Sequence, residues 1–183
     1  MNNGLSSKEF DDFVQRQQGP ADTVDWSKER DEWLNHLDRL YKKVTMLLAK
    51  YTPGQIQISY KPIGLNEEGI GSYEAQQMVL RIGRQEVDLV PIGTLLIGSK
   101  GRVDVSGPAG RAQILLVDSK VSDPRSLIHV TVSVGGKLPP PPPSKRAKEI
   151  QWEWKIVTRP PERRFIEITQ QSFFDLIMEV ANG

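Results

Sequence analysis

Three residues in the middle of the sequence have the types and spacing that metal-assisted hydrolysis requires. Asp104 lies in one predicted strand, and the run Asp118-Ser119-Lys120 ends a later strand. Two carboxylates on neighbouring strands can hold a divalent cation, and a lysine two positions further on can orient the attacking water. Asp104, Asp118 and Lys120 are therefore the candidate catalytic residues of a metal-dependent enzyme.

This spacing resembles the D…(D/E)-x-K pattern of restriction-like nucleases, and the resemblance covers these three residues and their strands. It implies metal-dependent cleavage of nucleic acid. Those nucleases place a crossover helix after the motif, whereas Pro124 and a further predicted strand follow here. A simpler interpretation pairs an outward-facing Asp104 with Arg102 or Arg81, so we keep the nuclease as an alternative function.

Other catalytic arrangements have less support in the sequence. Glu86, Asp88 and Asp104 share the polar faces of their strands, where cross-strand ion pairs with arginines explain them. His36 and His129 are the two histidines, and there is no cysteine, which excludes disulfides, thiolate metal sites and cysteine nucleophiles. We therefore expect no metal and no cofactor.

A second group of residues is suited to binding a partner. Trp26, Arg30 and Trp33 lie along one predicted helix, and tryptophan and arginine are enriched at the centres of protein interfaces. Trp26 and Trp33 are seven residues apart and share one helix face, so packing in the core is the alternative interpretation for them. Lys145 and Arg146 follow a run of five prolines and belong to a basic segment, residues 145–164. This segment gives a third hypothesis, weak binding of nucleic acid, although the net charge of +1 is not that of a typical nucleic-acid-binding domain.

The elements that would position these residues follow from hydrophobic periodicity. Apolar side chains recur at steps of three and four over residues 25–51, which predicts one long amphipathic helix. From residue 55 to 134, short alternating segments separated by glycine-containing turns predict an antiparallel sheet. Pro91 predicts an edge or a bulge, residues 113–117 predict a central strand, and residues 62–71 predict a loop.

The predicted fold class is α+β. N-terminal helices, including the long one, accompany a bent antiparallel sheet of about seven to nine strands, a meander or roll that is partly barrel-like, and a C-terminal helix. Residues 1–20 form an N-terminal arm with a short helix, and residues 21–183 form a single domain. Within it, residues 135–149 are a proline-rich spacer loop, and residues 150–183 are a strand pair and the last helix.

The leading functional hypothesis is a non-enzymatic interaction, regulatory or assembly subunit that acts through the long helix and an exposed sheet surface. It predicts a protein partner or self-association. No apolar run approaches the length of a membrane span and no secretory signal is visible, so we expect a cytoplasmic protein.

Overall fold

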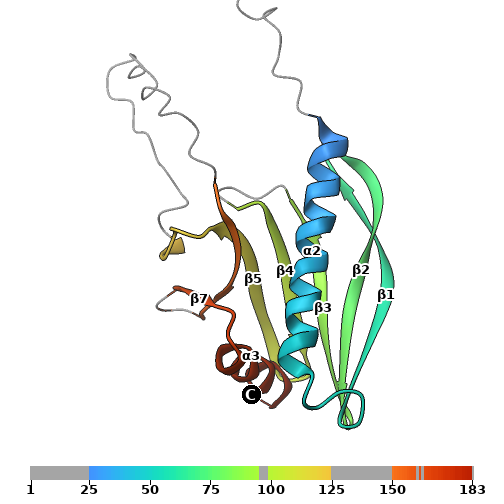
Figure 1. The fold of residues 1–183 in the computed structure, drawn as a ribbon, viewed down its shortest axis with the longest axis vertical. Coiled ribbons are helices and arrows are strands. Elements are labelled where there is room, and N and C mark those ends of the chain that lie inside the picture. Colours follow the sequence, from blue (N-terminus) through green and yellow to red (C-terminus); the bar gives the residue numbers. More distant parts are fainter. Residues whose placement is uncertain (1–24, 95–98, 125–149, 160, 162, 183) are drawn as a thin grey trace, which may run out of the picture.

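The computed structural model describes residues 25–94, 99–124, 150–159, 161 and 163–182. They form a seven-stranded antiparallel sheet in which the strands lie in chain order, together with two helices (Figure 1). This arrangement confirms the α+β prediction, and the sheet does not close into a barrel. The elements are α2 (Trp26–Leu48), β1 (Ile56–Glu67), β2 (Gly71–Ile82), β3 (Gln85–Gly93), β4 (Gly101–Gly107), β5 (Gly110–Asp118), β6 (Trp152–Val157), β7 (Phe165–Glu167) and α3 (Gln170–Asn182).

Helix α2 crosses one face of the sheet, which we call the inner face (Figure 1). It begins where the carboxylate of Asp25 accepts a hydrogen bond from the backbone N–H of Lys28 at 3.2 Å, a typical N-cap. Its apolar stripe is buried against the sheet, as the periodicity predicts: Trp33, Leu37, Leu40, Tyr41, Val44 and Leu48. The helix is three residues shorter at its C-terminal end than the predicted range of 25–51.

The core lies between α2, α3 and the inner face of the sheet. Alternate residues of the strands enter it, among them Met78, Leu80, Val87, Leu89, Val103, Val105, Ile114 and Leu116. Gly101 allows the closest approach, because a Cβ atom there would lie 2.2 Å from Cζ3 of Trp33. The Trp33 ring also packs against Trp154 with their centroids 5.8 Å apart. Trp33 therefore joins α2 to both β4 and β6.

The sheet register agrees with two detailed predictions. Strand β5 pairs with β4 on one side and β6 on the other, so residues 113–117 do form a central strand. The pairing of β3 with β4 shifts between Pro91 and Gly93, which is the predicted bulge. The short strand β7 and the strand β1 are the two edges of the sheet.

The hairpin of β1 and β2 differs from the prediction. Residues 62–71 were expected to form a loop, but β1 runs to Glu67 and pairs with β2 along its whole length. Pro62 does not interrupt β1, because β1 is an edge strand with a neighbouring strand on one side only. On its other side, the missing N–H of proline breaks no hydrogen bond of the ladder. Since β2 pairs with β3 only from Met78 to Ile82, residues 61–77 form a two-stranded arm that leaves the sheet. We call it the hairpin arm.

The tip of the hairpin arm is fixed at two points. A carboxylate oxygen of Glu67 accepts hydrogen bonds from the backbone N–H and the hydroxyl of Thr94 at 2.6 and 2.8 Å, and the Tyr73 hydroxyl donates to the same carboxylate. The ring of Trp26 lies so close to Gly69 that a Cβ atom there would be 2.6 Å from it. The arm is therefore held at its base by the sheet and at its tip by β3 and α2.

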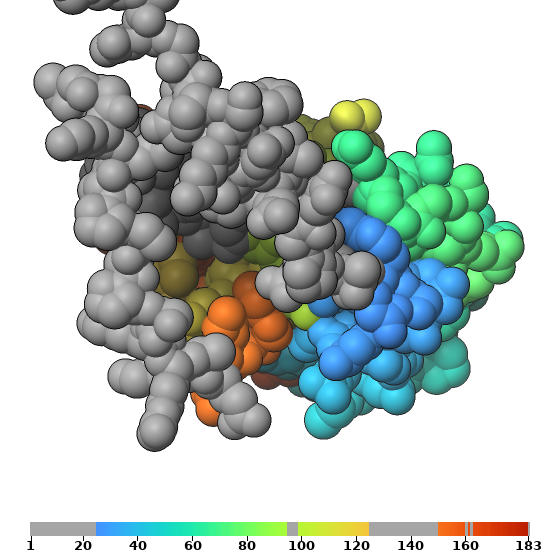
Figure 2. All heavy atoms as spheres, turned by 90° about the horizontal axis from the view of Figure 1, so that it is seen from above, coloured from blue at the N-terminus to red at the C-terminus, as the bar shows by residue number. Residues whose placement is uncertain are grey.

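Helix α3 closes the opposite end of the inner face. Phe173, Leu176, Ile177 and Val180 are buried, and the backbone carbonyl of Val180 accepts a hydrogen bond from the N–H of Ala109 in the β4–β5 turn. In the view from above, α2 lies with the hairpin on one side and β6 on the other (Figure 2). The structure thus confirms the predicted C-terminal helix.

Several predictions lie outside the described residues: the N-terminal arm, the strand at residues 127–134 and the proline-rich spacer at residues 135–149. None of the helices among the described residues is long and apolar enough to cross a membrane.

Candidate functional site

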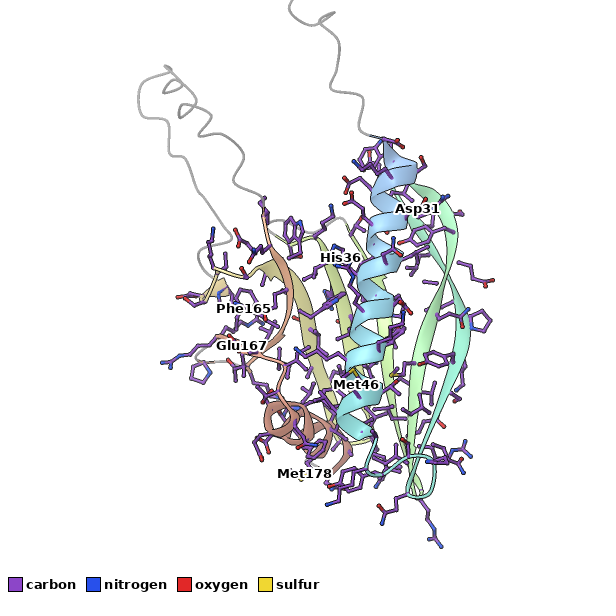
Figure 3. The ribbon with its side chains drawn as sticks, in the orientation of Figure 1. Asp31, His36, Met46, Phe165, Glu167 and Met178 are labelled. Carbon is purple, nitrogen blue, oxygen red and sulfur yellow. The ribbon has the colours of Figure 1, made fainter. Side chains whose placement is uncertain are left out.

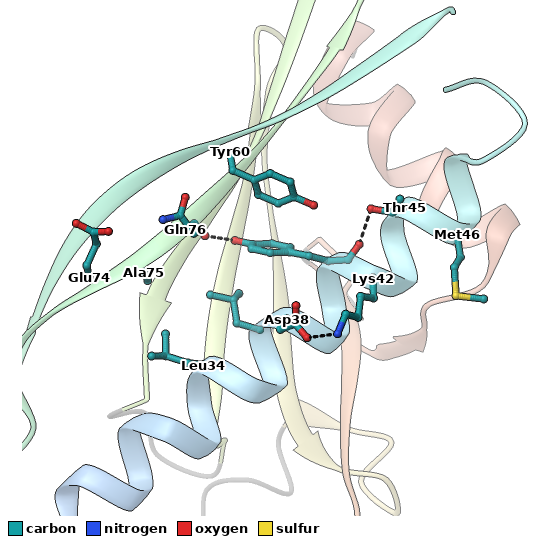
Figure 4. A pocket seen from close by; sticks show the side chains of 11 residues that line it. Leu34, Asp38, Lys42, Thr45, Met46, Tyr60, Glu74, Ala75 and Gln76 are labelled. Carbon is teal, nitrogen blue, oxygen red and sulfur yellow. Dashed lines mark hydrogen bonds and ion pairs between the residues drawn. The ribbon is translucent and has the colours of Figure 1, made fainter. Parts of the chain in front are cut away.

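A groove with a volume of about 660 Å³ lies between α2 and the hairpin arm (Figure 4). The groove lies beside the part of β2 that precedes Met78, because β2 pairs with β3 only from Met78 onwards. The lining comes from both sides: Leu34, Leu37, Asp38, Tyr41, Lys42, Thr45 and Met46 of α2, and Tyr60, Glu74, Ala75 and Gln76 of the hairpin.

Tyr41 holds the floor of the groove at the point where β2 and β3 separate. Its hydroxyl donates to the backbone carbonyl of Gln76 at 2.6 Å and lies 3.3 Å from the carbonyl of Leu89. Burial of the ring raises the pKa of this hydroxyl far above its usual value, so it remains a donor. Tyr41 therefore links α2 to both strands and stabilises the opening.

The rim of the groove carries exposed apolar side chains beside a few polar ones. Met46 has 77% of its surface exposed and Tyr60 has 49%. The Tyr60 ring packs on Tyr41 with centroids 5.9 Å apart. Lys42 forms an ion pair with Asp38 at 2.6 Å on the exposed side of α2. The groove is thus mainly apolar, with an ion pair along one edge.

A smaller apolar cleft of about 280 Å³ lies at the C-terminal end of α2, where that helix meets β1 and α3. Tyr51 and Phe174 form an edge-to-face pair inside it, with centroids 5.8 Å apart. Met178, with 54% of its surface exposed, lies at its border. Met46 and Met178 are on different helices and line different hollows (Figure 3).

A charged cluster joins the N-terminal part of α2 to β4. Lys100 donates to the carboxylate of Glu32, lies 3.4 Å from that of Glu29, and has its Nζ 5.7 Å from the ring centre of Trp152. Burial alone would lower the pKa of Lys100, but the hydrogen bond and charge of Glu32 and the charge of Glu29 outweigh it and raise that pKa. The hydrogen bond from Lys100 lowers the pKa of Glu32. This cluster is paired internally and so has a structural role.

The structure does not bring the three nuclease-like residues together. Asp104 is on the outer face of β4 and pairs across the sheet with Gln113, five positions before Asp118 on β5. At about 3.4 Å per residue, this places the two carboxylates roughly 17 Å apart along the strand. Asp118 is also two residues from Leu116 and so lies on the inner face of the sheet, whereas Asp104 lies on the outer face. The backbone N–H of Lys120 donates to the Asp118 carboxylate at 3.1 Å, as in a turn.

The carboxylates of the outer sheet face have ordinary partners. Asp104 accepts two hydrogen bonds from Arg102, at 2.6 and 2.7 Å. Glu86 pairs with Lys61 at 3.2 Å and Arg81 at 3.3 Å, as expected for cross-strand ion pairs. Within the described ranges, no group of three or more His, Asp or Glu side chains could hold a metal ion.

The residues expected to contact a partner have different environments. Trp33 is completely buried in the core, so the expectation that it meets a partner directly needs correction. Trp26 is 39% exposed but packs on Gly69 at the tip of the arm, and Arg30 is half-buried and pairs with Asp31 at 2.8 Å. Lys145 and Arg146 lie outside the described residues. The sequence reasoning missed the groove residues Tyr41, Met46 and Tyr60 as a set.

Comparisons with known proteins found no match: no family model, no curated protein and no solved structure is significantly similar to this chain. The fold and the groove together define an α+β protein with an open meander sheet, a hairpin arm that extends beyond β3, and an apolar groove between this arm and α2.

Proposed function

We propose that this chain is a non-enzymatic interaction subunit that binds an apolar segment of a partner protein in the groove between α2 and the hairpin arm. The observation that carries this proposal is the groove itself, about 660 Å³ of mainly apolar hollow between Tyr60 and Met46. The largest well-formed apolar hollow of a protein is its default binding site. The cytoplasm remains the location expected from the sequence.

The lining of the groove supports binding rather than catalysis. A catalytic hollow needs a base or nucleophile with perturbed acidity beside the reacting atoms. The titratable side chains here are Asp38, Lys42, Glu74 and two tyrosines, and Asp38 is paired with Lys42. Burial raises the pKa of Tyr41, so its hydroxyl stays protonated at neutral pH and does not supply a base.

The rim of the groove supports a protein segment as the occupant. Met46 is flexible and projects from α2, and methionine is common on surfaces that adapt to different apolar partners. Tyrosine and methionine are also enriched at protein interfaces. Tyr60 and Met46 lie on opposite sides of the hollow, so a helix or an extended segment lying along α2 would contact both.

The alternative of a metal-dependent nuclease has lost its geometric support, since Asp104 and Asp118 lie on opposite faces of β4 and β5. Weak binding of nucleic acid through residues 145–164 stays a lower-ranked hypothesis. Four of its basic residues are described. Arg159, Arg163 and Arg164 are exposed, whereas Lys155 is buried and donates to the backbone carbonyls of Ser119 and Val121.

Site-specific photocrosslinking tests the proposal in cells. A photoreactive amino acid placed at Tyr60 lies on the groove, whereas the same amino acid at Arg84 lies on the exposed β2–β3 turn. We expect position 60, but not position 84, to crosslink to one defined protein through an apolar segment. Crosslinking of equal yield and composition from both positions, or none from position 60, would contradict the proposed function.

A further inference from the structure

Besides the groove, the outer face of the sheet carries a separate hollow of about 290 Å³ whose lining is rich in arginine. Its charged lining comes from β4, β5 and the segment after β6, namely Arg102, Asp104, Arg111, Arg159 and Arg163, with Gln113 and Thr158 beside them. The register explains why these positions meet, because Asp104 pairs with Gln113 and Gln113 pairs with Val157. We call this hollow the arginine pocket.

The positive charge of the arginine pocket exceeds the negative charge that balances it. Asp104 neutralises Arg102 through two hydrogen bonds, at 2.6 and 2.7 Å, and these bonds raise the pKa of the arginine. Glu179 of α3 forms an ion pair with Arg159. Among the described residues these four arginines have two acidic partners, which leaves an excess of two positive charges on Arg111 and Arg163.

The walls of the pocket are held in place by the sheet rather than by loops alone. Arg102 has 29% of its side chain exposed and Asp104 has 21%, so this pair forms a fixed floor. A Cβ atom at Gly110 would lie 2.8 Å from Nη2 of Arg159, so this arginine rests directly on the β4–β5 turn. The guanidinium groups of Arg102 and Arg159 are therefore preorganised, and preorganisation lowers the cost of binding an anion.

We propose that the arginine pocket binds a phosphate group carried by a small molecule. The excess of two positive charges matches a phosphate monoester, which carries nearly two negative charges at neutral pH. Arginine is also the side chain whose planar fork best fits phosphate oxygens. This site is on the opposite side of the sheet from the groove and is independent of the proposed function.

The surroundings of the pocket favour a single phosphate group over a nucleic-acid backbone. Asp88 on β3 lies on the same outer face, opposite Ser106 on β4 and so beside the pocket. A long polyanion that continued from the pocket across β3 would meet this carboxylate, whereas a small phosphorylated molecule would not. Binding of a polyanion also usually needs a strongly basic domain, and the net charge here is +1.

Calorimetric titration of the full chain with inorganic phosphate, at constant ionic strength in chloride, tests this proposal. We expect saturable binding with a stoichiometry of one, and binding of methyl phosphate at the same site. The double variant Arg111→Gln/Arg163→Gln should lose phosphate affinity by at least tenfold. Both side chains are exposed, so its thermal midpoint without phosphate should stay near that of the unsubstituted protein.

The matched control is Arg39→Gln/Arg84→Gln, which removes the same charge from exposed arginines on α2 and on the β2–β3 turn. It should change phosphate affinity by less than twofold. Equal losses in both double variants would show general charge attraction and overturn the proposal, as would the absence of saturable binding. If the protein binds an oligothymidine that lacks a terminal phosphate but does not bind inorganic phosphate, the proposal is also overturned. The pocket would then belong to a nucleic-acid-binding surface.

Discussion

The substitution Tyr41→Phe tests how the groove is held open, because it removes one oxygen atom and keeps the ring. The Tyr41 hydroxyl donates to the carbonyl of Gln76 at 2.6 Å and lies 3.3 Å from that of Leu89. Without it, the Gln76 carbonyl loses this donor at the point where β2 has left β3. Leaving a buried acceptor without its donor costs about 1–3 kcal/mol, and partial access of water to Gln76 places the expected loss near 1.5–2 kcal/mol.

A loss of this size should be visible in a thermal or denaturant unfolding curve. For a domain of this size, about 1 kcal/mol shifts the melting temperature by roughly 2–4 °C, so Tyr41→Phe should lower it by about 3–8 °C. The matched control is Tyr60→Phe, since Tyr60 packs on the same ring but is 49% exposed and its hydroxyl has no hydrogen-bond partner among the described residues. That variant should change the free energy of unfolding by less than about 0.5 kcal/mol. Equal effects of the two substitutions would refute the assigned role of Tyr41.

Three further predictions test the packing, the hairpin arm and the pH dependence. Gly101→Ala would place a Cβ atom 2.2 Å from the Trp33 ring and should destabilise the fold by about 1–3 kcal/mol or more in urea unfolding, whereas Gly64→Ala meets nothing within 4 Å and should cost far less. Glu67→Ala removes the acceptor of Thr94 and should increase amide exchange in residues 61–77 more than in β5, and equal exchange would exclude a pinned arm. Burial, followed by the charges of Arg39 and Lys100, lowers the pKa of the His36 imidazole in the folded protein. The unfolded chain therefore binds a proton at His36 more readily than the folded protein does. The free energy of unfolding should consequently fall as the pH decreases from about 7.5 to 5.5. His36→Gln should flatten that slope, and an unchanged slope would show that another group causes it.

The helix and the strands whose apolar patterns in the sequence match the faces they bury were predictable. The stripe of α2 repeats over many turns, and each alternating strand of β3 to β6 has one apolar face. Pro91 indicated an edge or a bulge, because proline has no N–H that could donate to a neighbouring strand. These features depend on residues close together in the sequence.

The hairpin arm and the groove were not predictable in the same way. Pro62 and Gly64 are typical of loops, and only the position of β1 at the sheet edge allows them in a strand. The alternation that continues through Ile63 and Leu65 was the available signal. The groove then depends on where β2 stops pairing with β3, a long-range property.

The outer face shows the same limit. Alternation places Arg102, Asp104, Arg111 and Gln113 outward, but only the register of β4, β5 and β6 shows which of them meet. The same register separates Asp104 from Asp118, which the spacing in the sequence had suggested could act together. A polar strand face therefore gives candidate residues, and the pairing of strands decides which of them form a site.

The most direct test of the proposed function is the affinity of the crosslinked partner segment for two matched variants. Met46→Lys adds a charge to the groove, and Met178→Lys makes the same exposed substitution at the α2–α3 cleft. Because a lysine at this rim position would bring an ammonium group against the apolar segment, at a cost of about 1–2 kcal/mol, we predict about 5- to 30-fold weaker binding for Met46→Lys. Binding by Met178→Lys should equal that of the unsubstituted protein. Full affinity in Met46→Lys would contradict the assignment of the groove as the binding site.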